Sequence, residues 1–366
     1  MQDIKIITIQ GELIALLDGH TSFRGDVSLR EVGACELHIN LGAKGAIDIS
    51  KGHLIYLAKD RVWRITGIEI DEGDTYDLKV TGEQLKGILA QRLVLPSKKG
   101  TEELYGWERF PDPNDPEVAA ETVMRHYVTQ SCIDPEESTR IIDELTLRDD
   151  MATGLPLRWS ARFEQLDKVL EAIGQQGEVG WDVIYDIEAK EAVFVAVPYR
   201  NQVEGSDKPV IFSIEFENLA SLKYKDSTKD FINYVYAGGA GTDEDRLIIG
   251  AGYAASGLDR YETWADCGSA QNVDDLAFEA RHKLEQFKRQ ESLTGEALDS
   301  KSFVYRRDWD IGSIVTIRSK ALGVSIDQLI TSVREVYEKG TMTVTPTFGE
   351  RQKTIIDEIR KKETVR

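Results

Sequence analysis

The sequence is poor in cysteine and in long apolar runs, and each shortage excludes a class of protein. Its three cysteines, Cys35, Cys132 and Cys267, are widely spaced and form no CxxC pair. This argues against a disulfide framework and against a structural zinc site. No run approaches the roughly 20 apolar residues of a membrane helix, and the N-terminus lacks the order of regions of a signal peptide. We therefore expect a protein made in a reducing cytosol, which stays there or leaves by a route without a signal.

Positive charge is also scarce. The 366 residues include 64 Asp and Glu against 45 Lys and Arg, which gives a net charge of −19. Phosphate contacts need clustered Lys and Arg, so this balance argues against a general nucleic-acid binder and against attraction to anionic membranes. The hydrophobic content of 41% is enough for real cores, and the length allows two or three domains.

The chain divides into β-rich and mixed regions. Residues 1–100 contain short β-type runs separated by Gly, Asp and Lys, and such runs return after residue 209. Between them, amphipathic helical patterns precede two apolar strands. We therefore predict an α+β fold with a first β-barrel module at 1–100, an α/β domain at 101–208, a second β-barrel module at 209–349 with a helix near 274–291, and a C-terminal helix at 350–366.

Three further helices are predicted from capping residues and apolar spacing. One follows a capping-box pattern over residues 81–92. The second begins after a proline-rich linker, at an Asp-Pro-Glu sequence, and covers 115–128. The third has apolar residues three or four apart over 160–173, and glycines beyond it indicate its end.

An internal repeat links the two β-rich regions. The segments 52–82 and 312–349 each open with Gly and a short apolar strand, continue through an Ile-Thr pair and an acidic turn with Gly, and end in an alternating strand and Gly. The Ile-Thr pairs are Ile65-Thr66 and Ile330-Thr331. The match indicates two copies of one module on either side of the α/β domain.

Asp308 and Asp310 form the best candidate for a catalytic acid pair. On a strand they would share a face about 6.6 Å apart, since the rise is about 3.3 Å per residue. That distance lies at the lower end of the roughly 6.5–9.5 Å found in inverting glycosidases. Every D-x-D strand satisfies this spacing, however, and the repeat matches Gly312 with Gly52, where no aspartate pair precedes the strand. We interpret both carboxylates as the polar edge of a barrel strand that faces a neighbouring subunit.

Other motifs predict no catalytic, cofactor or metal site. The glycine-rich loop at 238–241 lacks the Lys-Ser or Lys-Thr of a P-loop and precedes an acidic run. The five histidines show no HxH or HExxH spacing, and no serine lies in a G-x-S-x-G motif. A carbohydrate-binding surface would need several aromatic side chains exposed on one face. We instead expect core positions for Trp159, Trp181, Trp264 and Trp309.

Four groups of sequence segments, taken in order, resemble the sequences of a known family. They are GELIALLDGHTSFRGDVSLREVGACELHINL, then AAETVMRHYV, then YAGGAGTDEDR with SGLDRYETWADC, and finally RRDWDIGSIVTI with DQLITSVREVYEKG and VTPTFG. Their order is similar to that of the siphophage gene-37-like tail proteins. These resemble in architecture the baseplate hub of contractile phages and the N-terminal part of tail-associated lysins. The resemblance covers nearly the whole chain.

The resemblance also marks positions that we predict to serve assembly rather than catalysis. They are Gly239, Arg246, Arg260, Glu262, Asp266, Asp308 and Gly312. The first five match the family's glycine-rich loop and its R-x-E-x-x-x-D stretch, and the last two match the start of a strand. There, Ser313 replaces the Asp that is more frequent in the family, which weakens any role for a second carboxylate.

The resemblance implies a structural baseplate hub or tail-tip protein of a phage, prophage or phage-like particle, located in the virion tail after assembly in the host cytoplasm. Such hubs are homotrimers, and two tube-like β modules per subunit would present six modules to a six-fold tail tube. The implied partners are the tail tube or distal tail protein, the tape-measure protein, and the central spike or fibres. DNA would pass an acidic channel without specific binding, with no membrane contact, enzymatic activity or cofactor.

Two alternatives stay open. Because larger relatives carry lysin domains, the first is a tail-associated cell-wall hydrolase or a carbohydrate-binding tail protein. We expect no added lytic domain, since the chain ends soon after the second module. The second alternative is a secretion-system component of the same architecture.

Overall fold

The computed structural model describes residues 4–17, 20–71, 76–96, 108–227, 231–242, 245–268, 270, 272–285, 290–298, 303–321, 323–338 and 340–349. The chain forms two compact units. The large unit comprises Met1–Leu222 and Thr294–Arg366, and the small unit comprises Lys223–Leu293. The C-terminal helix predicted at 350–366 lies outside the described residues.

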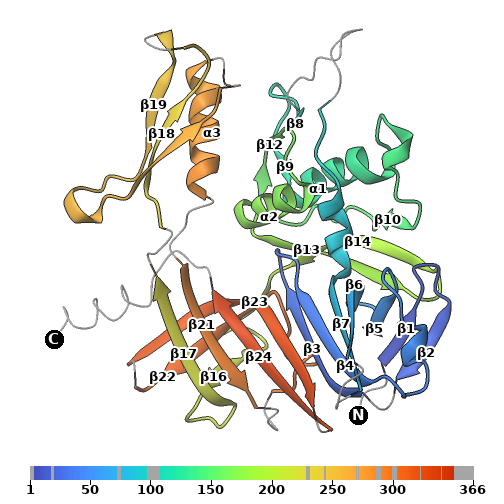
Figure 1. Cartoon of the computed structure of the whole chain (residues 1–366). Helices are drawn as coiled ribbons and strands as arrows, with labels where there is room; N and C mark the ends of the chain where they lie inside the picture. The colour runs from blue at the N-terminus through green and yellow to red at the C-terminus, as the bar shows by residue number, and fades with distance from the viewer. Residues whose placement is uncertain are drawn as a thin grey trace. The chain divides into compact units, whose positions relative to one another are not determined.

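The large unit begins with a β region that contributes to two cores. Successive strand residues point to opposite faces, so Ile6 and Ile55 enter one core while Ile7 and Leu54 enter the other. The short apolar runs of the sequence account for this region, which Figure 1 draws in blue. Its strands are β1 (Ile4–Ile7), β2 (Leu13–Leu17), β3 (His20–Ser28), β4 (Ala34–Asn40), β5 (Leu54–Ala58), β6 (Arg61–Asp71) and β7 (Asp77–Gln84).

An α/β layer packs against this region and shares one of its cores. Strand β13 is buried on both faces because α2 covers one face and the first β region meets the other. Figure 1 shows α1 and α2 beside β13 and β14. The elements of the layer are β8 (Glu108–Phe110), β9 (Val118–Ala119), α1 (Ala120–Val128), β10 (Leu145–Leu147), β11 (Pro156–Leu157), β12 (Trp159–Ala161), α2 (Leu166–Gln176), β13 (Val179–Asp186) and β14 (Glu191–Pro198).

The second β region of the large unit continues the first β region through strand pairing. Strand β23 pairs with β3 in antiparallel fashion, and the sheet runs in the order β17-β21-β24-β23-β3-β4-β7-β6-β5-β1-β2. In the described residues this path is open rather than closed into rings, so the two-barrel architecture stays a prediction. The strands are β15 (Arg200–Gln202), β16 (Ile211–Ser213), β17 (Leu219–Ser227), β21 (Gln290–Ala297), β22 (Ser313–Ser319), β23 (Val324–Glu338) and β24 (Thr341–Gly349).

The sequence repeat corresponds to a structural repeat. Strands β5, β6 and β7 form a three-stranded antiparallel meander, and β22, β23 and β24 form another. Gly52 and Gly312 open the two copies with φ values of 90° and 81°, which glycine adopts without steric cost. Each donates its N–H to an isoleucine carbonyl, Gly52 to Ile65 at 2.8 Å and Gly312 to Ile330 at 3.0 Å. The next residue in each copy, Thr66 or Thr331, lies at a register shift of the ladder.

The small unit is a three-stranded sheet with one helix. Its order is β19 (Ile248–Gly252), β18 (Tyr234–Gly238) and β20 (Glu262–Asp266). Helix α3 (Val273–Glu285) packs on one face, with a core of alanines, Val235, Cys267 and Leu276. The helix cap expected at Asn272 is present, because the Asn272 side chain accepts a hydrogen bond from the Asp275 N–H at 2.9 Å.

The predicted helices differ from the observed ones mainly at their ends. In 81–92, strand β7 continues to Gln84 because its ladder with β4 and β6 extends that far, and a 3-10 helix follows at Leu85–Gln91. The helix expected from 115 begins at Ala120, and the one expected from 160 begins at Leu166. The helix expected over 274–291 is α3, and Gln290 already belongs to β21. For α3 the cap was correct, whereas the starts predicted for the other three helices were too early, and at 81–84 strand pairing overrules the helix.

Candidate functional site

A buried arginine joins the two copies of the repeat. Arg61, at the start of β6, has a side chain that is only 2% exposed. Its Nε donates to Glu335 Oε1 of β23 at 2.7 Å. Its Nη2 donates to Asp310 Oδ1 at 2.6 Å and to the Tyr305 hydroxyl at 2.8 Å. Its Nη1 donates to the carbonyl of Asp60 at 2.9 Å. We call these five residues the arginine clamp.

Within the clamp, the positive charge of Arg61 is balanced by the groups that bind it. Burial disfavours the charged form of Arg61, but Tyr305 and the surrounding carboxylates outweigh this effect and hold its pKa well above the ordinary value. Burial raises the pKa of Tyr305 well above its ordinary value, and its hydroxyl donates to Glu335 at 2.6 Å. Arg61 is thus held in its charged form and Tyr305 in its neutral form by fixed partners, which suits a structural joint.

Asp308 and Asp310 have different hydrogen-bond partners, one in the turn before Trp309 and the other in the arginine clamp. Asp308 accepts a hydrogen bond from the Val304 N–H at 2.7 Å and closes the turn before Trp309. The hydrogen bond from Arg307, followed by the one from Val304, lowers the pKa of Asp308. Asp310 instead binds Arg61 of the same chain, and our interpretation of that carboxylate as facing a neighbouring subunit stays a prediction.

The other five predicted residues cluster in the small unit. Gly239 follows β18 and donates its N–H to the carbonyl of Leu247 at 2.8 Å. Arg246 donates to the carbonyls of Gly238 and Gly239 and to the carboxylate of Asp266. The glycine-rich loop is therefore tied by Arg246 to strand β20, which carries Asp266.

Arg260 and Glu262 form a second pair on the same sheet. Arg260 donates to the Glu262 carboxylate, and its guanidinium carbon lies 3.6 Å from the ring centroid of Tyr234. Close by, Trp264 is 50% exposed, whereas Trp159, Trp181 and Trp309 are buried. The prediction of a core position is therefore confirmed for three tryptophans and wrong for Trp264, which points away from α3 because β20 alternates its faces.

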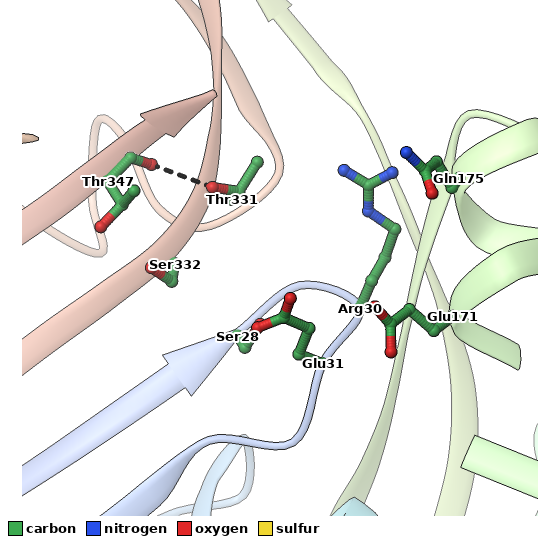
Figure 2. A pocket seen from close by; sticks show the side chains of 8 residues that line it. All are labelled: Ser28, Arg30, Glu31, Glu171, Gln175, Thr331, Ser332 and Thr347. Atoms are coloured by element: carbon green, nitrogen blue, oxygen red, sulfur yellow. Dashed lines mark hydrogen bonds between the residues drawn. The ribbon is translucent and has the colours of Figure 1, made fainter. Parts of the chain in front are cut away.

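A polar cavity of about 220 Å³ lies where the first β region, helix α2 and the second β region meet. Figure 2 shows residues of α2 and of the loop after β3 on one side and residues of β23 and β24 on the other. The Thr331 hydroxyl, at the register shift of β23, donates to the carbonyl of Thr347 at 3.4 Å. The lining residues are Ser28, Arg30, Glu31, Glu171, Gln175, Thr331, Ser332 and Thr347.

A second buried charge was not anticipated from the sequence. Lys86 is fully buried and donates to the carbonyls of Ser28 at 2.6 Å and Trp181 at 3.1 Å. Burial lowers the pKa of Lys86 and raises that of nearby Asp182, while each charge partly offsets the shift of the other. Neither Lys86 nor Arg61 belongs to a motif, and Arg61 is 249 residues from Asp310 and 274 from Glu335, so no local pattern identifies them.

The described residues contain no group of three or more His, Cys, Asp or Glu side chains arranged to hold a metal ion. In the same part of the chain, no helix is both long and apolar enough to cross a membrane.

Solved structures with a similar fold include several tail proteins. The 43 kDa tail protein of prophage MuSo2 from Shewanella oneidensis aligns with a TM-score of 0.53 at 11% identity, over 95% of this chain and 98% of that chain. A tail protein from Neisseria meningitidis MC58 gives 0.53 at 11%, over 97% and 98%. Prophage tail protein gp18 from Listeria monocytogenes EGD-e gives 0.50 at 9%, over 99% of both chains. The chain thus shares its fold with these tail proteins.

The family follows from the sequence match. The family described as Siphovirus ReqiPepy6 Gp37-like protein matches residues 3–350, and the chain belongs to this family. The predicted resemblance to the siphophage gene-37-like family is confirmed. None of the curated proteins matches the chain.

Proposed function

We propose that this protein is a non-enzymatic hub component of a phage or phage-like tail, which connects the tail tube to the central spike or fibres. The observation that carries the proposal is the repeated meander. Two copies share a left-handed glycine, an isoleucine acceptor and a register shift, and they lie in one sheet through the pairing of β3 with β23. Three such chains in a ring would offer six similar meanders, which matches a six-fold tube.

The arginine clamp supports this assembly role. It ties the start of β6 to β23 and to the turn before β22, so the two meanders of one chain keep a fixed relation. A ring that must match a six-fold partner needs such a fixed relation between its repeated parts. The carboxylates in the clamp are bound to one arginine, which favours a structural role over hydrolysis.

The chain would have the domain organisation predicted from the sequence. Residues 1–100 and 209–349 would form the two tube-like modules, with 101–208 as the domain between them. The partners would be a second and third copy of this chain, the tail tube or distal tail protein, the tape-measure protein, and spike or fibre proteins. The excess of acidic residues favours a channel that DNA passes without binding, in the tail of the virion.

Two measurements test the proposal. Light scattering of the purified protein should give the mass of a trimer. Electron micrographs of tails assembled without this protein should show missing tips, and adding the purified protein back should restore them. Intact tips in its absence would overturn the hub role, and a stable monomer at the concentration of the assembly reaction would overturn the ring.

A further inference from the structure

The open face of the small-unit sheet carries a layer of aromatic side chains. Alternation along the strands sends Val235 and Ala265 toward α3 and sends Tyr234, Tyr236 and Trp264 to the opposite face. On this open face Tyr236 is 40% exposed and Trp264 is 50% exposed. Burial of apolar area therefore does not explain why Tyr236 and Trp264 lie there.

Glycines in the neighbouring strands hold two of these rings close to the backbone. A Cβ atom added at Gly250 would lie 2.3 Å from the Tyr234 hydroxyl oxygen and 3.0 Å from its ring. A Cβ atom added at Gly238 would lie 2.5 Å from the Trp264 ring. The rings occupy the space that side chains would otherwise fill, as in the aromatic rescue of strand glycines. The aromatic rings on this face consequently lie close to the strand backbone.

Two ion pairs frame the aromatic layer. Arg260 lies over the Tyr234 ring and binds Glu262, and the Arg246 guanidinium carbon lies 5.4 Å from the Trp264 ring centroid and binds Asp266. The two arginines balance the two carboxylates, so the frame has no net charge. It nevertheless provides oriented hydrogen-bond donors and acceptors beside exposed rings.

The size of the sheet limits what it can hold. Each strand has five residues, so the three strands cover about 16 Å by 10 Å at a rise of about 3.3 Å and a strand spacing of about 4.8 Å. This backbone footprint of roughly 160 Å² suits a short linear ligand, whereas a standard protein interface buries roughly 800 Å² of accessible surface per partner. The neutral frame also gives a polyanion no advantage.

We propose that this face binds a short segment of a neutral polysaccharide. The C–H faces of sugar rings would stack on Trp264 and Tyr236, because a pyranose offers the flat apolar surface that an exposed aromatic ring accepts. Sugar hydroxyls would hydrogen-bond to the guanidinium of Arg260 and the carboxylates of Glu262 and Asp266. No bond is broken, and the inference does not depend on the hub role.

The test uses the full-length protein and three soluble probes, N-acetylchitotetraose, cellotetraose and maltotetraose, in calorimetric and saturation-transfer titrations. Wild type should bind at least one probe. Trp264→Ala should weaken that binding about tenfold or more, which corresponds to about 1.4 kcal/mol. Tyr236→Ala provides a second variant in case the first does not fold. Leu258→Ala is the matched control, because Leu258 is 97% exposed in the same unit but lies in the 3-10 turn Gly257–Asp259.

Three results would overturn the proposal. The first is the absence of binding to all three probes by wild type. The second is equal binding by wild type and by both aromatic variants. The third is a change of oligomeric mass in Trp264→Ala by light scattering, which would make the face a protein contact. Tail assembly is measured separately, so failure here leaves the hub proposal standing, and failure of that proposal leaves this one standing.

Discussion

The two meanders of the large unit are alike in their backbone and different in their charges. Both begin at a left-handed glycine that bonds an isoleucine carbonyl, and both have a register shift at the following threonine. The first meander, however, contributes the buried cation Arg61, whereas β23 of the second contributes the buried carboxylate Glu335. The backbone geometry is thus common to the copies, while their side chains have become complementary and hold the copies together.

Removing the cation of the clamp should produce the largest effect. In Arg61→Met, Glu335 loses its charged partner while it remains buried, and breaking a buried pair in this way costs about 3–5 kcal/mol. Urea unfolding at constant slope should show this loss in the free energy of unfolding. Arg61→Met combined with Glu335→Gln should recover part of it.

The neighbour of Glu335 supplies the control. Arg334 of the second copy also pairs with the first β region, with Asp26 of β3 at 2.6 Å, but its side chain is 49% exposed. Arg334→Met should therefore cost less than about 1 kcal/mol. Equal losses of unfolding free energy in Arg61→Met and Arg334→Met would mean that the clamp stabilises the protein no more than a surface ion pair does.

Of the two aspartates, the one bound to the buried arginine should matter more for the free energy of unfolding. Asp310→Asn removes one charged acceptor of Arg61 and should cost about 1.5–3 kcal/mol, as is usual for hydrogen bonds to charged groups. Asp308→Asn keeps an acceptor for the Val304 N–H and should cost less. A cell-wall zymogram is the second readout: clearing by wild type that Asp308→Asn abolishes would contradict the structural interpretation of both residues.

The opening glycines should show whether the two copies are equivalent. Gly52→Ala and Gly312→Ala should each cost about 1–3 kcal/mol, because alanine must adopt a left-handed conformation. A Cβ atom would meet nothing closer than 3.5 Å at either position, so the loss reflects backbone strain rather than a clash. Asn tolerates this conformation better, and Gly→Asn should recover part of the loss at both sites. A loss at only one site would show that the copies are not equivalent.

The sequence revealed the shared backbone features but not the clamp. Glycine and the Ile-Thr pair are local signals, because the conformation that they support depends on adjacent residues. Arg61 and Glu335 are charged residues in strands, and at the sequence level they look like solvated side chains. Only the pairing of β3 with β23 brings them together, and a contact between residues 274 apart has no local signature.

The small unit shows the same division between local and long-range information. The cap and apolar face of α3 were predictable, and the family resemblance selected Arg246, Arg260, Glu262 and Asp266 together. Their position on one exposed face depends on strand order, because β18 pairs with β19 and with β20. Trp264 could not be assigned to the core or to the surface before that order was known.

A small pH effect should separate the two β regions near neutrality. His38 of β4 contacts Asp77 at 2.7 Å and Glu36 at 3.2 Å, and the hydrogen bond to Asp77 is the main cause of its raised pKa. A raised folded pKa means that this stabilisation is fully present below about pH 6.5 and is lost as the pH rises through the folded pKa. The second β region contains no histidine over residues 290–349, so it lacks this effect.

The measurement is a double difference in the free energy of unfolding, wild type against His38→Gln at pH 5.5 and pH 8. The His38 side chain is 30% exposed, so the difference should favour wild type by less than about 1 kcal/mol at pH 5.5 and should be smaller at pH 8. Hydrogen exchange, corrected for intrinsic rates, should assign the change to β4 and β7 and leave β23 and β24 unaffected. An equal change in β23 and β24 would mean that the paired regions open as one cooperative unit, because the clamp and the β3–β23 ladder transmit the loss from the first β region to the second.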